Sequence, residues 1–171
     1  FIKRDDEFTV NIALVENQIP VLGVIYVPVT RDLYFSEKKI GSYKMNMSNF
    51  SHNLDKLIES STKLPIDSDN TSYTIVASRS HMSLETEQFI KDKKKKYDNI
   101  ELISRGSSLK LCMVAEGKAN CYPRYAPTME WDTAAGHAIC LNAGFNVIDY
   151  VTKKPMIYNR ENLLNNWFIV E

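Results

Sequence analysis

Hydrophobic and polar residues alternate at the start of the chain, which predicts a β-strand. Every second residue from Phe8 to Leu14 is apolar, and a period of two places alternate side chains on opposite faces of a sheet. Further β-rich runs follow at 21–29, 32–36 and 41–45. Their short connections favour antiparallel neighbours. Residues 1–46 are therefore predicted to form an antiparallel meander that belongs to an incomplete amino-terminal domain.

Residues 47–72 are rich in Ser, Asn and Asp and predict a connector with one short helix. Beyond it, β-rich runs alternate with segments that carry helix-start signals. Strands are predicted at 73–78, 99–104, 119–123, 145–150 and 167–170, and helices near Ser83, Ser107 and Asp132. This order favours an α/β fold, with a mixed sheet covered by helices across a carboxy-terminal domain of residues 73–171.

Three polar loops open the predicted helices. Their sequences are Ser78-Arg79-Ser80-His81, Gly106-Ser107-Ser108-Leu109-Lys110 and Trp131-Asp132-Thr133. Ligands of such sheets bind beyond the carboxyl ends of strands, where strands lead into helices. The loops are therefore expected to converge on one ligand site.

Asp132 is the candidate metal ligand. It is expected at the start of a helix that ends near Gly144, where the helix dipole favours an ionised carboxylate. Carboxylate oxygens are ligands that Mg²⁺ prefers. The small residues Thr133, Ala134 and Ala135 would let a phosphate approach the helix start closely. The alternative is an ordinary Asp cap on a core helix.

The loop at 106–110 has the composition of an anion-binding loop. Backbone N–H groups at Gly106, the hydroxyl of Ser107 and the ammonium of Lys110 suit an anion. The glycine spacing of a P-loop is absent. The alternative is a capped helix with a solvated lysine.

The remaining candidates are Ser78, His81 and Arg124. Ser78 offers a hydroxyl, His81 could bond a ribose hydroxyl or stack beside a base, and Arg124 could contact a phosphate or an adenine ring. The alternatives are a helix-capping turn with an exposed His81 and a prolyl loop that only orients the next helix. No motif set for nucleophilic catalysis is present, so no catalytic residue is assigned.

The charge balance argues against nucleic acid as a partner. The chain has 21 Lys and Arg and 21 Asp and Glu, so its net charge is zero. The lysine run at 93–96 is interpreted as a solvated helix end. No apolar run is long enough to span a membrane. Three cysteines without zinc-type spacing indicate reduced thiols in a cytoplasmic protein.

Trp131-Asp132-Thr133-Ala134-Ala135-Gly136 resembles the carboxy-terminal signature of the inositol monophosphatase superfamily. The loops at 78–81 and 106–110, together with Val114-Ala115-Glu116-Gly117 and Tyr122-Pro123-Arg124, resemble more specifically the CysQ-type 3′(2′),5′-bisphosphate nucleotidases. The resemblance also covers residues 8–14, so it spans nearly the whole chain.

The resemblance implies the layered sugar-phosphatase fold and a Mg²⁺-dependent, lithium-sensitive phosphatase. Its substrates would be adenosine 3′,5′-bisphosphate and the related phosphosulfate of sulfur assimilation. Asp132 would bind Mg²⁺, and Ser78, His81, Gly106 and Lys110 would hold the nucleotide. A metal-activated water would attack in line with the leaving oxygen.

The family's metal-binding Glu and its Asp-Pro-(Ile/Leu)-Asp-Gly-Thr motif precede the strand that begins near Phe8, and this sequence contains neither. The chain is therefore expected to be a carboxy-terminal portion that is inactive alone and associates with the missing segment or with itself. The alternatives are a relative that acts on inositol phosphates or fructose 1,6-bisphosphate, and a non-catalytic interaction module.

Overall fold

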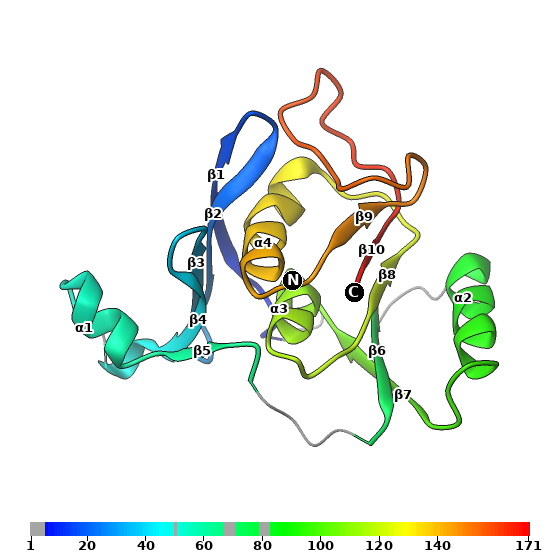
Figure 1. Cartoon of the computed structure of the whole chain (residues 1–171), viewed down its shortest axis with the longest axis horizontal. Coiled ribbons are helices and arrows are strands. Elements are labelled where there is room, and N and C mark those ends of the chain that lie inside the picture. Colours follow the sequence, from blue (N-terminus) through cyan, green and yellow to red (C-terminus); the bar gives the residue numbers. More distant parts are fainter. Residues whose placement is uncertain (1–5, 50, 67–70, 79–82) are drawn as a thin grey trace.

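The structure is a computed structural model that describes residues 6–49, 51–66, 71–78 and 83–171 (Figure 1). The first sheet is an antiparallel meander in the order β1-β2-β3-β4-β5. Its strands are β1 (Val10–Glu16), β2 (Ile19–Val27), β3 (Asp32–Glu37), β4 (Gly41–Asn46) and β5 (Thr62–Leu64). The predicted antiparallel pairing is confirmed for β1 to β4, and β5 adds a fifth strand that the sequence analysis did not predict. The short helix α1 (Leu54–Glu59) and a 3₁₀ turn (Met47–Asn49) lie between β4 and β5.

The second half forms a parallel pair of strands and a three-stranded antiparallel sheet, and a bridge joins the two into a mixed layer. Its elements are β6 (Tyr73–Ser78), α2 (Leu84–Lys94), β7 (Ile100–Arg105), α3 (Leu109–Ala115), β8 (Tyr122–Arg124), α4 (Glu130–Asn142), β9 (Val147–Asp149) and β10 (Phe168–Val170). Strands β6 and β7 are parallel. A parallel bridge from Ile75 to Cys121 joins β6 to the segment that leads into β8. Strand β10 pairs antiparallel with both β8 and β9.

Helix α4 lies between the two sheets, with α3 beside it (Figure 1). Strand β2 approaches α4 so closely that a β-carbon at Gly23 would overlap the carbonyl oxygen of Ala135 and lie 2.9 Å from the β-carbon of Ala138. A β-carbon at Gly136 would lie 2.5 Å from Leu111 of α3. The small residues of α4 therefore serve close packing between the layers.

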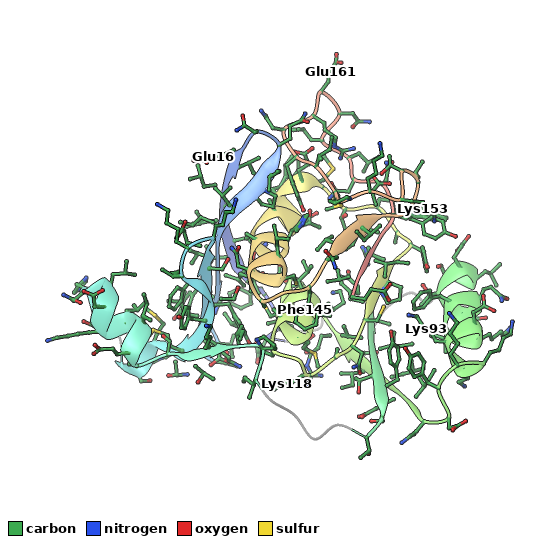
Figure 2. The ribbon with its side chains drawn as sticks, viewed as in Figure 1. Glu16, Lys93, Lys118, Phe145, Lys153 and Glu161 are labelled. Carbon is green, nitrogen blue, oxygen red and sulfur yellow. The ribbon has the colours of Figure 1, made fainter. Side chains whose placement is uncertain are left out.

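The ends of the helices follow the local sequence. Helix α2 is capped by Ser83, whose hydroxyl accepts a hydrogen bond from the Thr86 amide at 3.3 Å. Helix α4 ends before Gly144, which adopts a left-handed backbone with φ of 94°. Not every lysine of the 93–96 run is solvated. Lys93 is only partly exposed, and its Nζ donates hydrogen bonds to Tyr73 Oη and Glu171 Oε2, both at 2.9 Å (Figure 2).

Part of the outer face of the first sheet is exposed among the described residues. Helix α1 covers another part by packing Leu57 against Phe35 and Met45. On β1, the outward-facing side chains are about half exposed, at 50% for Val10 and 60% for Ile12. Together with Phe8 and Leu14 they form a continuous apolar strip, which we call the β1 strip.

The three cysteines, Cys112, Cys121 and Cys140, are buried and unpaired by disulfides, as the expectation of reduced thiols requires. Burial raises the pKa of each thiol above its ordinary value, to about 12 for Cys121. Within the described residues, no helix is long and apolar enough to cross a membrane.

Candidate functional site

The carboxyl ends of β6 and β7 lie side by side. Ser78 and Arg105 are register partners in the parallel pair, so the backbone of Ser78 lies beside the start of the 106–110 loop. This places the first residue of the 78–81 loop beside the start of the 106–110 loop at one edge of the sheet. The predicted contacts of His81 lie outside the described residues.

The polar face of β1 and the residues before it hold the 106–110 loop. The Gly106 amide donates to Glu7 Oε2 at 2.6 Å. The hydroxyls of Thr9 and Ser107 lie 2.7 Å apart, and Asn11 Nδ2 donates to Ser108 Oγ at 2.7 Å. The loop thus binds a carboxylate of its own chain through an amide that was predicted to bind an anion.

Sequence analysis missed Glu7, Thr9 and Asn11 as site residues. A signal for them was present, because they are the polar positions that alternate with the apolar residues of the first strand. The alternation identified two faces without indicating that the polar face would contact a loop about a hundred residues further along the chain.

Lys110 lies beneath the loop and is not solvated. Its side chain is 6% exposed, and Nζ donates to the carbonyl oxygens of Ser107 at 2.8 Å and Arg105 at 3.1 Å. The ammonium also lies 5.5 Å from the ring centre of Tyr122. Burial, followed by the nearby charge of Arg124, lowers the pKa of Lys110 to about 8. The alternative of a solvated lysine is therefore wrong, and the described contacts of Lys110 support the loop from behind.

Asp132 lies in the first turn of α4, at the helix start where it was predicted, but it is not the N-cap. Met129 is the N-cap, because its backbone is extended with φ of −101° and ψ of 160°, so Asp132 is the third helical residue. Its Oδ2 accepts a hydrogen bond from the Met129 amide at 2.8 Å. The Asp132 side chain is exposed, and its carbonyl lies 3.4 Å from Ser108 Oγ, which joins this loop to the 106–110 loop.

The small residues after Asp132 do not leave the helix start open to a phosphate. Thr133, Ala134 and Ala135 are all buried, with exposures of 7% or less. Ala135 packs against β2, where Gly23 allows the close contact, whereas the Thr133 hydroxyl accepts hydrogen bonds from Tyr158 and Asn165. The prediction of an open, small-residue helix start is therefore wrong at these positions, because tertiary packing uses the small side chains.

Arg124 lies at the end of β8 beside the same edge. One terminal nitrogen donates to the Pro127 carbonyl at 3.1 Å. Its Nε is buried and has no hydrogen-bond partner among the described residues. A buried guanidinium N–H without an acceptor is costly, so Arg124 is suited to an incoming acceptor such as a phosphate oxygen.

A cavity of about 460 Å³ lies between β1 and the start of α4. Asn11 and Trp131 line it, whereas Ser107, Lys110 and Arg124 do not. Its walls combine apolar residues such as Ala13, Val15 and Ala134 with polar residues such as Glu130 and Asn159. We therefore place the candidate site at the converging loops and not in this cavity.

Asp132 fits the role of one oxygen ligand to a divalent cation, because its carboxylate is exposed at a helix start. Across the residues that the structure describes, no group of three His, Cys, Asp or Glu side chains could hold a metal ion. Asp132 is therefore one candidate ligand, and the described part of the chain does not complete a metal site around it.

The family model for the inositol monophosphatase family matches residues 1–169. The chain belongs to the inositol monophosphatase family. Its fold class is confirmed by a crystal structure of CysQ from Bacteroides thetaiotaomicron, which is 55% identical with a TM-score of 0.94. That match covers 100% of this chain and 65% of the crystallised chain.

Curated relatives point to one branch of the inositol monophosphatase family. The 3′(2′),5′-bisphosphate nucleotidase CysQ of Salmonella typhimurium (strain LT2) is 41% identical over 171 residues, covering 99% of this chain and 62% of its own length. The enzyme of the same name from Escherichia coli (strain K12) is 40% identical with the same coverage. The chain thus spans about three fifths of these relatives, and its resemblance to CysQ nucleotidases is confirmed.

A more distant structure shares the fold alone. Inositol monophosphatase II from Staphylococcus aureus MSSA476 is 17% identical, with a TM-score of 0.70 over 99% of this chain and 57% of its own. The inositol monophosphatase fold is therefore retained at low identity, whereas the similarity to CysQ extends to the sequence.

Proposed function

We propose that this chain is the carboxy-terminal portion of a magnesium-dependent 3′(2′),5′-bisphosphate nucleotidase. Its substrates are adenosine 3′,5′-bisphosphate and the corresponding phosphosulfate, which it converts to products that lack the 3′-phosphate. The observation that carries the proposal is the joining of the 106–110 loop to Asp132 through Ser108, in a chain 41% identical to a CysQ nucleotidase. The buried thiols support a reducing, cytoplasmic location.

The chain's own groups bind and orient the nucleotide. The amide of Gly106 and the hydroxyl of Ser107 donate hydrogen bonds to the phosphate once it displaces Glu7 from the loop. The Nε–H of Arg124 gains the acceptor that it lacks among the described residues. Ser78 and His81 are assigned to the nucleoside. Lys110 holds the loop carbonyls and contributes positive charge from beneath.

Asp132 is assigned as one ligand of Mg²⁺. Bound magnesium supplies charge neutralisation on the phosphate and an activated water. Because the described residues supply one candidate carboxylate, we assign the remaining ligands to sequence that the longer relatives carry. The 171-residue polypeptide alone is therefore inactive, and lithium inhibits the whole enzyme at its metal site.

The β1 strip is assigned to the same additional sequence. Its apolar side chains are about half exposed, and β1 is the edge strand of its sheet. An exposed apolar edge strand associates with another chain or segment. In the whole enzyme that segment covers the strip, and in the isolated polypeptide a second copy does.

Phosphate release tests the proposal. The polypeptide of 171 residues and the product of the complete reading frame are each assayed with Mg²⁺ and adenosine 3′,5′-bisphosphate. Activity confined to the longer protein is expected. Preference for inositol 1-phosphate or fructose 1,6-bisphosphate would instead support the corresponding relative, and no hydrolysis by the longer protein would support a non-catalytic module.

A further inference from the structure

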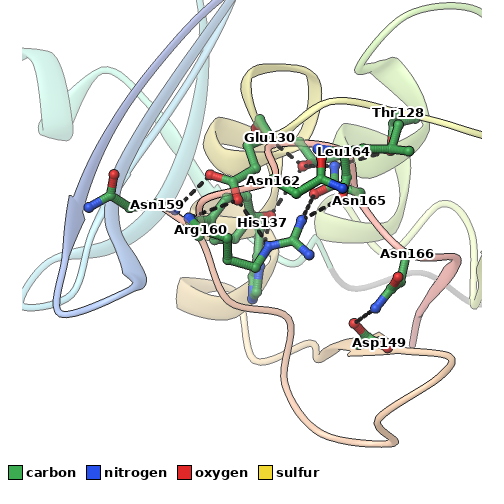
Figure 3. Close-up of polar contacts among 12 residues, drawn as sticks. Thr128, Glu130, His137, Asp149, Asn159, Arg160, Asn162, Leu164, Asn165 and Asn166 are labelled. Carbon is green, nitrogen blue, oxygen red and sulfur yellow. Dashed lines mark hydrogen bonds and ion pairs between the residues drawn. The ribbon is translucent and has the colours of Figure 1, made fainter.

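The segment after β9 holds the start of α4 through a buried ionic network (Figure 3). Glu130, the first residue of α4, is 8% exposed. Its Oε2 accepts from the Asn159 amide at 2.6 Å, and its Oε1 accepts from Arg160 Nε at 3.0 Å and from the Arg160 amide at 3.3 Å. A carboxylate with three such donors is firmly oriented.

The network continues from Arg160 to both sides of Asp132. Arg160 donates to Asn165 Oδ1 at 3.2 Å. The side-chain amide of Asn165 then donates to Thr133 Oγ1 at 3.0 Å and to Thr128 Oγ1 at 3.1 Å. Asn165 is itself 5% exposed. One buried amide therefore links the residue that follows Asp132 to the residue that precedes the N-cap.

The backbone of the same segment fixes the amide that orients the Asp132 carboxylate. Met129 forms an antiparallel bridge with Leu164, and the Glu130 amide donates to the Leu163 carbonyl at 3.0 Å. The Met129 amide is the donor to Asp132 Oδ2. The carboxylate direction thus depends on where this segment holds residue 129.

We propose that Glu130, Arg160 and Asn165 are positioning residues for the metal ligand Asp132. The proposal rests on the proposed function, since it assumes that Asp132 binds Mg²⁺. The network clamps the first turn of α4 on the side that faces the 159–165 segment, and the Asp132 carboxylate remains exposed for a cation. Loss of hydrogen bonds from this network lowers the fraction of molecules in which the Asp132 carboxylate is oriented to bind the cation.

Two variants and a matched control test the proposal in the product of the complete reading frame. Glu130→Gln replaces one acceptor oxygen with a donor, and Arg160→Lys keeps the charge but loses the planar fork. The control is Glu116→Gln, because Glu116 is 3% exposed and ion-paired to Lys44 and Lys118, which belong to neither α4 nor the 159–165 segment. All three variants lose a buried charged contact, and only the first two affect the start of α4.

Mn²⁺ affinity, measured by electron paramagnetic resonance of the free ion, is the readout that a purely structural role would not move. Binding by Glu130→Gln and Arg160→Lys is expected to weaken about tenfold, whereas Glu116→Gln keeps wild-type affinity despite a similar loss of thermal stability. Amide hydrogen exchange is expected to accelerate at residues 129–133 in the first two variants alone.

Unchanged Mn²⁺ affinity in both variants would overturn the proposal, as would an equal loss in the control. It would also be overturned if Asp132→Asn bound Mn²⁺ like wild type, because Asp132 would then not be a ligand. A wild-type protein that binds Mn²⁺ through Asp132 and hydrolyses no nucleotide would refute the proposed function and leave this inference supported.

Discussion

Substituting Gly23 by alanine is expected to separate the first sheet from α4. The added β-carbon would overlap the carbonyl oxygen of Ala135 and lie 2.9 Å from the β-carbon of Ala138. Carbon atoms pack best at about 3.5 Å or more, so β2 or α4 must move by at least about 0.6 Å. The main obstacle is helix backbone, which cannot rotate away as a side chain can.

The expected cost follows from overpacking a rigid interface. Such insertions typically cost about 1–3 kcal/mol, and the backbone obstacle places Gly23→Ala near the upper end, at about 3 kcal/mol. For a chain of this size that corresponds to a fall in melting temperature of about 6–12 °C. Urea unfolding followed by circular dichroism is expected to show a lower midpoint with an unchanged slope.

Gly144→Ala is the matched control for this substitution. No atom lies within 4 Å of a β-carbon at Gly144, but its φ of 94° disfavours an L side chain. It should cost about 1–2 kcal/mol through backbone strain alone. A Gly23→Ala protein as stable as wild type, or no less stable than Gly144→Ala, would refute the close approach of β2 to α4.

Three further predictions concern the loop and the β1 strip. The pKa of Lys110 is about 8 in the folded protein against 10.5 in the unfolded chain, so the unfolded chain binds more protons between these pH values. The free energy of unfolding should therefore rise by up to about 3 kcal/mol from pH 8 to pH 10.5. Urea titrations of Lys110→Met should show no such rise. Glu7→Gln should weaken the hydrogen bond from the Gly106 amide by about 1–2 kcal/mol and accelerate hydrogen exchange of that amide. An unchanged exchange rate would contradict the contact. Ile12→Lys should reduce self-association of the 171-residue chain in sedimentation experiments, because Ile12 lies in the β1 strip. The control Leu84→Lys, at an 80% exposed site on α2, should leave self-association unchanged. Equal effects of the two substitutions would argue against the β1 strip as the interface.

The local pattern of the sequence was sufficient for most elements. Alternation from Phe8 to Leu14 predicted β1, and Ser83 predicted the start of α2. Gly144 predicted the end of α4. The motif around Asp132 indicated the family, which the comparisons confirm. These features depend on residues within a few positions of one another, so propensity and periodicity are enough to predict them.

The details of the candidate site depended on contacts between distant segments. Glu7 and Asn11 contact the 106–110 loop across nearly a hundred residues, and Arg160 reaches Glu130 across 30. The burial of Lys110, which rules out the alternative of a solvated lysine, likewise depends on the tertiary structure.

The chemical types at the site were thus determined by the sequence alone: a carboxylate at a helix start, an amide-rich loop and nearby cations. Only the tertiary structure decided their roles. It placed Asp132 at the third helical position and used the small residues after it to pack α4 against Gly23. The physical reason is that a side chain's local surroundings set its chemistry, whereas burial and orientation follow from which layers pack together.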